Sequence, residues 1–356
     1  GMRFQHCLVR ASLFLSLAPS SVSGLQIGPL LSTCVDACQR GCNEIRAVHA
    51  SRDKVGLKFE LKDAADPRSA LTEADGAAQK AIVGALRAEW GPELRIVGEE
   101  DDDDELSAAI ENSKFEPLKR DMFDDDVGET AEIDASEISV FVDPLDGTRE
   151  FVEGRVANCQ SLIGISIGGE AIAGVIGIPF PAGDLSTDST IIYGLEDIGS
   201  GVIGAPLTRG PFPLDHHIDG LKYPRPHHAT GDSSADVMKA SRRAAIQKFG
   251  GSNVIYGGAG NKILGAALGE VASSIQHRVG GPWDIAAPSA VLKSMGGKIT
   301  NMFGDEIDLR DERCHEKGYI ATPPNSDNNM FHDALVAAIL AQPEFQEYKK
   351  QHGKKE

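Results

Sequence analysis

The chain has 356 residues, of which 41% are hydrophobic and 25% charged, a composition typical of soluble globular proteins. Its formal net charge of −18 argues against nucleic-acid polymers and anionic membranes as partners, because both call for a basic face. No segment is long and apolar enough to span a membrane, and the length predicts two domains or one broad layered unit.

Residues 1–24 predict either a targeting segment or a poorly ordered or docked extension. Arg3 and the short apolar run 13–18 loosely resemble a signal or transit peptide, but Ser16 interrupts that run and Arg10 lies close to it. If residues 1–24 are only an extension, we expect the protein in the cytoplasm. If they are a targeting segment, we expect it in an organelle or on the secretory route.

A first amphipathic helix is predicted over residues 29–50. Cys34, Cys38 and Cys42 recur at every fourth residue, which places them on one face of that helix. Zinc sites usually need tighter pairs and partners elsewhere, so these residues are interpreted as small apolar core residues in a reducing compartment. A disulfide framework is not expected in a chain of this size.

A second helix is predicted from Asp75 to about Trp90, closed by Gly91-Pro92. Asp75 has a simple structural interpretation as an acid near a helix N-terminus. The strand-like run 94–97 then leads into Glu99-Glu100. The acid-rich residues 101–137 are predicted to be a solvated, mobile insert, since they lack the spaced ligands and glycine turn of a calcium loop.

The most informative motif follows the predicted strand 139–142. Asp143 and Asp146 lie three residues apart in Asp-Pro-Leu-Asp-Gly-Thr, and such close carboxylates repel unless a cation lies between them. Aspartate oxygens and backbone carbonyls suit Mg²⁺ far better than zinc. The same string also occurs as an ordinary turn.

The remaining elements alternate between strands and helices, which favours an α/β layer flanked by helices. The expected strands are 161–167 and 171–178 (a hairpin), 254–256, 273–277 and 298–301, and the expected helices are 261–268, 284–295 and 333–340. A boundary near residue 185 divides an N-terminal α+β domain (25–185) from a C-terminal α/β domain (186–345), and a frayed basic tail (346–356) follows. Asp284 is predicted at the start of a helix, where capping is its simple interpretation.

In combination these motifs resemble the magnesium-dependent, lithium-sensitive phosphatase superfamily that includes the inositol monophosphatases. The resemblance covers about residues 28 to 340 and rests on Gly98-Glu99-Glu100, the Asp143–Thr148 motif and Trp283-Asp284-x-Ala286-Ala287, in that order. It implies an α+β or α/β layered sandwich of the αβαβα type. The chain lacks a convincing Ser-His-Asp, Cys-x₅-Arg or P-loop arrangement.

Within that superfamily the chain is most similar to the 3′(2′),5′-bisphosphate nucleotidases. The features are the segment from Asp143 to Gly154, the long acidic insert, and the glycine-rich run from Gly257 to Lys262. This similarity implies a phosphoric monoester hydrolase that removes the 3′(2′)-phosphate of adenosine 3′(2′),5′-bisphosphate, with two or three Mg²⁺ ions as cofactor.

The resemblance also implies a role for each site residue. The metal ligands would be Asp75, Glu99, Asp143, the Leu145 carbonyl, Asp146 and Asp284. Thr148 would orient and deprotonate the attacking water, relaying its proton to Asp75 or Glu99, because an aliphatic hydroxyl is not a base unaided. The implied substrate contacts are Gly147, Thr148, Thr230, Ser233, Gly258 and Lys262.

The chain departs from the nucleotidase pattern at Ser233, where nucleotidases carry a histidine; the upstream pair His227-His228 is a candidate substitute. The glycine run and Lys262 also have simple interpretations as a turn and a solvated helix residue. Three hypotheses follow: a bisphosphate nucleotidase, an inositol phosphate phosphatase with the same mechanism, and a non-catalytic metal-dependent sensor. The expected partner is a small phosphorylated substrate, and the expected assembly is a monomer or homodimer.

Overall fold

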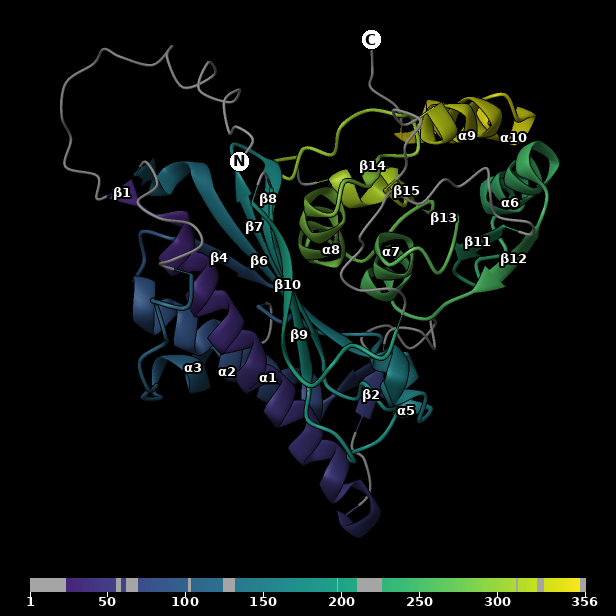
Figure 1. Ribbon diagram of the computed structural model, residues 1–356. Coiled ribbons are helices and arrows are strands. Elements are labelled where there is room, and N and C mark those ends of the chain that lie inside the picture. Colours follow the sequence, from purple (N-terminus) through teal and green to yellow (C-terminus); the bar gives the residue numbers. More distant parts are fainter. Residues whose placement is uncertain are drawn as a thin grey trace, which may run out of the picture.

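The computed structural model describes residues 24–55, 59–61, 70–101, 104–123, 132–196, 198–209, 226–311, 313–324 and 330–352. Their helices and strands stack in alternating layers, helix–sheet–helix–sheet–helix (Figure 1). The predicted αβαβα sandwich is therefore confirmed. The targeting segment predicted within residues 1–24 lies outside the described residues apart from Gly24.

The first two layers are a helical pair and a six-stranded sheet. Helices α1 (Ile27–Val55) and α2 (Glu73–Trp90) cover one face of the sheet, as Figure 1 shows. The strands follow the order β10-β9-β8-β7-β6-β4, and only the β4–β6 pair is parallel. Their bounds are β4 (Arg95–Gly98), β6 (Ile138–Asp146), β7 (Gln160–Ile167), β8 (Glu170–Ile178), β9 (Thr190–Leu195) and β10 (Gly199–Gly204).

The cysteine stripe of α1 packs against this sheet. Cys34, Cys38 and Cys42 are free thiols with no exposed surface, and a Cβ added at Gly177 of β8 would lie 2.4 Å from the Cys42 Sγ. Burial raises the pKa of the Cys34 thiol well above its usual range, because the interior disfavours a thiolate. The prediction of small core residues is confirmed.

Residues 104–123 of the predicted solvated, mobile insert are mostly exposed, as predicted, but three buried side chains anchor them. Ile110 is the buried residue of helix α3 (Asp104–Glu111), and Leu118 and Phe123 are buried in the core between α1, α2 and the sheet. Composition misled the prediction, because a few well-spaced apolar side chains anchor a segment that is otherwise acidic. A short strand, β5 (Ile133–Asp134), then pairs with β1 (Gly24–Leu25).

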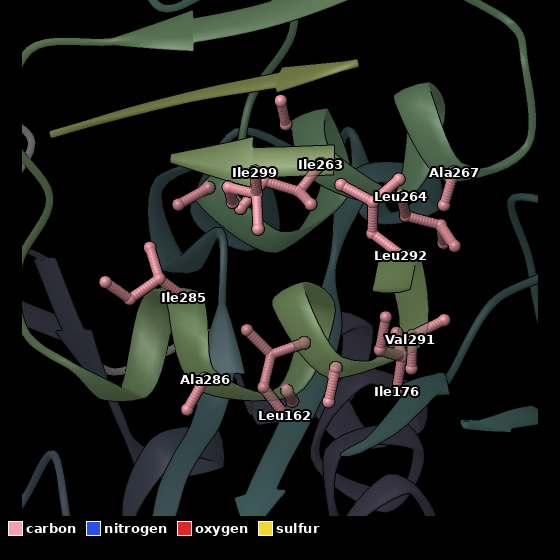
Figure 2. Close-up of a cluster of buried hydrophobic side chains, with 14 of the residues drawn as sticks. Leu162, Ile176, Ile263, Leu264, Ala267, Ile285, Ala286, Val291, Leu292 and Ile299 are labelled. Atoms are coloured by element: carbon pink, nitrogen blue, oxygen red, sulfur yellow. The ribbon is translucent and has the colours of Figure 1, made fainter. Parts of the chain in front are cut away.

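The middle layer contains α7 (Ala259–Ala267) and α8 (Trp283–Ser294), between the first sheet and a second one. Figure 2 shows side chains of both helices packed with Leu162 and Ile176 of the first sheet and Ile299 of the second. The second sheet has the order β12-β11-β13-β15-β14. Its strands are β11 (His227–Thr230), β12 (Ser252–Ile255), β13 (Ser273–Gln276), β14 (Lys298–Thr300) and β15 (Tyr319–Thr322).

The last layer consists of α6 (Asp236–Phe249), α9 (Met330–Leu340) and α10 (Pro343–His352). The prediction of a frayed tail from residue 346 is wrong as far as His352, because α10 buries Phe345 and Tyr348 in the core beneath it. Smaller elements are the β2 (Phe59–Leu61) and β3 (Ala70–Thr72) pair, α5 (Thr148–Val152), and the 3₁₀ turns η1 (Ala135–Glu137), η2 (Val156–Asn158) and η3 (Cys314–Lys317).

The predicted domain boundary near residue 185 stays a prediction. Strands β9 and β10 follow that point and complete the first sheet, while the second sheet begins at His227. Within the described ranges, no helix combines the length and the apolar character that a membrane crossing requires.

Helix α8 approaches the first sheet so closely that glycine is required opposite it. A Cβ at Gly164 of β7 would lie 2.4 Å from the Ala286 Cβ and 2.5 Å from the Ala287 nitrogen. A Cβ at Gly174 of β8 would lie 2.3 Å from the Ala287 carbonyl oxygen. Glycine inside a strand commonly marks such a close approach of backbone.

We expect Gly164→Ala to lower the free energy of unfolding by about 3 kcal/mol, since the methyl group would overpack a rigid helix backbone. Gly76→Ala is the matched control. Nothing lies within 4 Å of a Cβ at that helical position, so alanine should raise stability by about 0.5 kcal/mol. Denaturant unfolding of both variants measures the effects, and equal stabilities would contradict the close-packing argument.

His332 of α9 makes the stability depend on pH. The ring has no exposed surface and lies 3.1 Å from the Thr300 hydroxyl and 3.0 Å from the Thr322 hydroxyl. Burial lowers its pKa to about 4; Lys298 adds to the effect and Asp333 opposes it. The folded protein therefore holds the ring neutral at a pH where the unfolded chain already binds a proton.

Because the folded-state pKa lies below the unfolded value of about 6.5, this contribution is present above pH 6.5 and is lost as the pH falls toward 4. The loss amounts to about 3 kcal/mol. We expect His332→Gln, which cannot titrate, to be less sensitive to acid over that window. Denaturant titrations at several pH values test this, and parallel pH profiles for the two proteins would contradict it.

Candidate active site

The Asp-Pro-Leu-Asp motif lies within β6, which continues to Asp146. The sequence predicted that the strand would end in a tight turn, whereas the structure shows an extended strand whose pairing with β7 shifts between Asp143 and Asp146. The irregularity arises at the Pro-Leu step, since proline has no N–H for the ladder. Both carboxylates are buried, with 2% and 5% of their residue surfaces exposed.

Asp143, Asp146 and Asp284 converge to form what we call the carboxylate cluster. One oxygen from each lies within 4.8 Å of the others, although Asp284 comes from α8 and the other two from β6. Burial, followed by Glu99, Asp146 and Asp284, raises the pKa of Asp143 well above its usual range. Three carboxylates concentrated in this way need a positive charge among them.

Asp284 is not the N-cap of its helix. Helix α8 begins at Trp283 with Pro282 as its N-cap, and the Asp284 Oδ2 instead accepts the Gly281 N–H at 2.8 Å. Burial, together with Asp146 and Glu99, raises the pKa of Asp284 to about 8. The side chain therefore faces the cluster, and the simple capping interpretation is wrong.

Glu99 and Leu145 lie beside the cluster. The parallel pairing of β4 with β6 brings Glu99 next to Asp143, and the Glu99 N–H donates to the Val142 carbonyl at 2.9 Å. The Leu145 N–H donates to the Asp143 Oδ1 at 3.0 Å, and the Leu145 carbonyl oxygen lies 3.0 Å from the Thr148 Oγ1. Every acid that the resemblance implied for the first two metal positions is thus gathered at one place.

Thr148 and Asp75 form a hydroxyl–carboxylate pair. The Thr148 Oγ1 donates to the Asp75 Oδ1 at 2.9 Å, which favours Asp75 over Glu99 as its partner. The other oxygen of Asp75 accepts the N–H and the hydroxyl of Thr72, at 2.8 and 2.6 Å, in a capping box that starts α2. Asp75 therefore caps a helix with one oxygen and orients Thr148 with the other.

The pKa of Asp75 is raised to about 7, chiefly by burial and secondarily by Glu99 and Glu100, while Thr72 opposes the shift. A carboxylate that titrates near neutral pH suits proton transfer at that pH. Gly147 precedes this pair with φ of 87°, a left-handed conformation that glycine adopts without a steric penalty.

The residues of the cluster fit a hard divalent cation. All the converging donors are carboxylate oxygens or a backbone carbonyl, and no sulfur or imidazole ligand lies among the described cluster residues. Such a donor set favours Mg²⁺, Ca²⁺ or Mn²⁺ over zinc. The cluster also carries the mutual repulsion that a bound cation would relieve.

A cavity of about 910 Å³ opens beside the cluster. Of the predicted substrate residues, Gly147, Thr148, Ser233, Gly258 and Lys262 line it. Thr230 does not line it: the residue is fully buried, and its hydroxyl hydrogen-bonds to Asn253 of β12 and to Arg242 of α6. The role of Thr230 as a substrate contact stays a prediction.

Lys262 differs from the solvated residue that was the simple alternative. Only 3% of its surface is exposed, and its Nζ donates to the carbonyls of Tyr256 and Gly258. Burial lowers its pKa, and Asp146 is the largest of the acids that oppose the shift. Its positive charge therefore partly compensates the carboxylate cluster.

Sequence reasoning missed three arginines in the cavity wall: Arg149, Arg155 and Arg278. The Arg149 Nη1 donates to the Asp232 Oδ2 at 2.8 Å, and Arg155 binds Glu150 through two hydrogen bonds. No metal motif or spacing signals these residues. The position of Arg149 directly after Thr148 was the one available hint.

Comparison with known proteins agrees with this geometry. Residues 29–342 match the inositol monophosphatase family. The chain belongs to the inositol monophosphatase family. It is 32% identical to 3′(2′),5′-bisphosphate nucleotidase 1 of Homo sapiens over 72% of this chain and 80% of the relative. It is 26% identical to the Golgi-resident adenosine 3′,5′-bisphosphate 3′-phosphatase of Rattus norvegicus over 87% of this chain and 80% of that protein.

Solved structures share the fold. The extragenic suppressor protein suhB of Bartonella henselae aligns with a TM-score of 0.60 at 17% identity, over 88% of this chain and 98% of that one. The Staphylococcus aureus protein SaIMPase-II, solved with bound 2′AMP, aligns with a TM-score of 0.58 at 16% identity, over 90% and 98% of the two chains. The predicted class of phosphoric monoester hydrolase is confirmed by the family and its curated relatives.

Proposed function

We propose that this family member removes the 3′(2′)-phosphate of adenosine 3′(2′),5′-bisphosphate with two or three Mg²⁺ ions. The observation that carries the proposal is the Thr148–Asp75 pair, because Thr148 lines the same cavity as the carboxylate cluster. The curated relatives are named for the bisphosphate nucleotide, which favours that substrate over an inositol phosphate.

Asp143, Asp146, Asp284, Glu99 and the Leu145 carbonyl would hold the cations. When bound, Mg²⁺ supplies Lewis-acid stabilisation of the charge that develops on the phosphoryl oxygens. Asp75 accepts three hydrogen bonds, two from Thr72 and one from Thr148, which leaves about one acceptor position for the weaker third cation. Its contact with Thr148 assigns Asp75 to proton transfer as well.

The chain's own residues then handle the attacking water. The Thr148 hydroxyl donates to Asp75, so its lone pairs are available to accept a hydrogen bond from water. Proton transfer through Thr148 ends on Asp75, whose raised pKa favours accepting it. Thr148 would thereby orient the water for attack on phosphorus, and the proton would come to rest on the Asp75 Oδ1.

The remainder of the substrate needs cations and an apolar wall. Arg278 is exposed, and no hydrogen bond or ion pair of the described residues engages it, which suits a second phosphate better than the buried Lys262. Ile255, Tyr256 and Val279 also line the cavity and offer apolar surface for a base. By the resemblance, Ser233 would stand where nucleotidases carry a histidine.

The test is phosphate release with Mg²⁺ from adenosine 3′,5′-bisphosphate beside inositol 1-phosphate and inositol 1,4-bisphosphate. We expect the nucleotide to give the highest kcat/KM. A preference for an inositol ester would keep the mechanism and reassign the substrate. Mg²⁺ binding without release from any substrate in the panel would favour the non-catalytic sensor.

Two further predictions stay open and belong with this proposal. A cytoplasmic location and a monomer or homodimer are expected from the sequence. The existence of a Golgi-resident relative keeps the organelle alternative in view. Immunofluorescence of the full-length protein and light scattering of the purified protein test the two predictions.

A further inference from the structure

Asp146 makes contacts that the metal cluster does not require. Its Oδ1 accepts the Ala259 N–H at 2.9 Å, and its Oδ2 accepts the N–H groups of Gly260 and Asn261 at 2.9 and 3.3 Å. These are amides at the start of α7, whose N-cap, Gly258, offers no side chain. A carboxylate from β6 therefore caps a helix more than 110 residues away in the sequence.

The end of α7 that Asp146 holds is also the end that faces the cavity. Gly258, Ala259 and Lys262 all line the cavity. A Cβ at Gly258 would lie 2.7 Å from the Asp146 Oδ2, so the carboxylate and the loop are in close contact. Lys262 adds charge attraction to the three hydrogen bonds.

Counting lone pairs shows what Asp146 can still bind. An ionised carboxylate offers about four acceptor positions, and three N–H groups use three of them. One position is left for a cation in the cluster. Asp143 differs, because among the hydrogen bonds of the described residues it accepts one N–H, that of Leu145, and none from α7.

We propose that Asp146 is a positioning residue that couples occupancy of the carboxylate cluster to the order of the first turn of α7. In the metal-free protein the repulsion from Asp143 and Asp284 acts on the same side chain that caps the helix. A cation removes that repulsion and holds Asp146 in place against the three amides. The metal therefore prepares the substrate-binding loop before any substrate arrives.

The coupling is reciprocal by thermodynamic linkage. If bound metal favours the ordered first turn of α7, a substitution that disorders this turn must weaken metal binding. Gly258→Ala introduces a methyl group against the Asp146 Oδ2 and a strained backbone at φ of 72° while it removes none of the ligand residues. We expect its Mg²⁺ dissociation constant to rise at least about tenfold. Gly231→Ala is the matched control, since a Cβ there would meet the Gln276 side chain at an ordinary 3.5 Å.

The direct test is hydrogen exchange of the amides of Ala259, Gly260 and Asn261, followed by NMR in substrate-free protein during a Mg²⁺ titration. We expect exchange at these amides to slow at least about tenfold, with the midpoint that calorimetry gives for Mg²⁺ binding. Asp143→Asn should move both midpoints together to higher Mg²⁺. Amides in the first turn of α6 should not respond. A cap with a purely structural role would show the same exchange at every Mg²⁺ concentration.

This inference rests on the proposal that Asp146 binds the metal, and the outcomes separate the two. Mg²⁺ binding and phosphate release without any change at the three amides would overturn the coupling and leave the proposed function intact. If calorimetry detects no Mg²⁺ binding, both are wrong. If Gly258→Ala and Gly231→Ala bind Mg²⁺ with equal affinity, the coupling is also wrong.

Discussion

Asp143→Asn should lower kcat/KM for adenosine 3′,5′-bisphosphate by about 10³-fold or more. Asp143 lies at the centre of the cluster, where Glu99, Asp146 and Asp284 all act on its charge. Asparagine keeps the carbonyl oxygen that accepts the Leu145 N–H but removes one negative charge from the cation site. Loss of several kcal/mol of charge stabilisation in the transition state corresponds to a rate loss of this order.

The same substitution should make the metal-free protein more stable. Burial and neighbouring acids oppose ionisation of Asp143, so replacing it by a neutral residue of the same shape relieves repulsion. Wild type should gain more thermal stability from Mg²⁺ than the variant does, because a ligand that binds the folded state raises its stability.

Phosphate release and thermal melts with EDTA or with Mg²⁺ measure both effects. Asp308→Asn is the control, since that half-exposed carboxylate pairs with Arg310 away from the cavity. Unchanged activity of Asp143→Asn would remove the residue from the proposed metal site. A lower melting temperature in EDTA would contradict the repulsion argument.

Thr148→Ala should lower kcat by about 10²- to 10⁴-fold, the range that a positioned proton-transfer group contributes. The substitution removes the hydroxyl that donates to Asp75 and leaves the carboxylate cluster untouched. Mg²⁺ affinity should therefore stay within about twofold of wild type. Thr148→Ser is the matched variant, because it retains the hydroxyl.

Steady-state kinetics and calorimetric Mg²⁺ titrations of both variants separate the effects. Serine should retain most of the activity, and alanine should lose it through kcat rather than KM. Equal losses in the two variants would show that the methyl group matters and not the hydroxyl. A large loss of Mg²⁺ affinity in the alanine variant would assign Thr148 to metal binding.

Much of the fold could be predicted from the sequence because its signals are local. The helical spacing of Cys34, Cys38 and Cys42 predicted a buried face of α1, and the pair Gly168-Gly169 marked the β7–β8 hairpin. The predictions failed where a few residues determine whether a segment packs against the core. Leu118 and Phe123 anchor an acidic segment, and Phe345 and Tyr348 hold a basic one. Composition averages over such anchors and misses them.

The carboxylates of the site could be predicted because their chemistry requires fixed residue types in a fixed order. The structure places Asp143, Asp146 and Asp284 together and pairs Thr148 with Asp75. The substrate-contacting residues were harder to predict, because the burial of their side chains depends on packing between strands that are distant in the sequence. Thr230 lies behind the cavity wall, and Lys262 is enclosed. Of the cavity arginines only Arg149 lies in a motif segment, the one from Asp143 to Gly154, and Arg155 and Arg278 lie outside it.

The ion pair between Arg149 and Asp232 affects how an anion reaches this cavity. Both side chains are substantially exposed, 40% and 53%, so their attraction is weak and falls with ionic strength. A phosphorylated nucleotide also approaches a protein of net charge −18, and that repulsion acts at a distance. Added salt screens the repulsion and loosens Arg149 from Asp232. These two effects would favour association, whereas screening of the attraction between the phosphates and the cavity cations would oppose it.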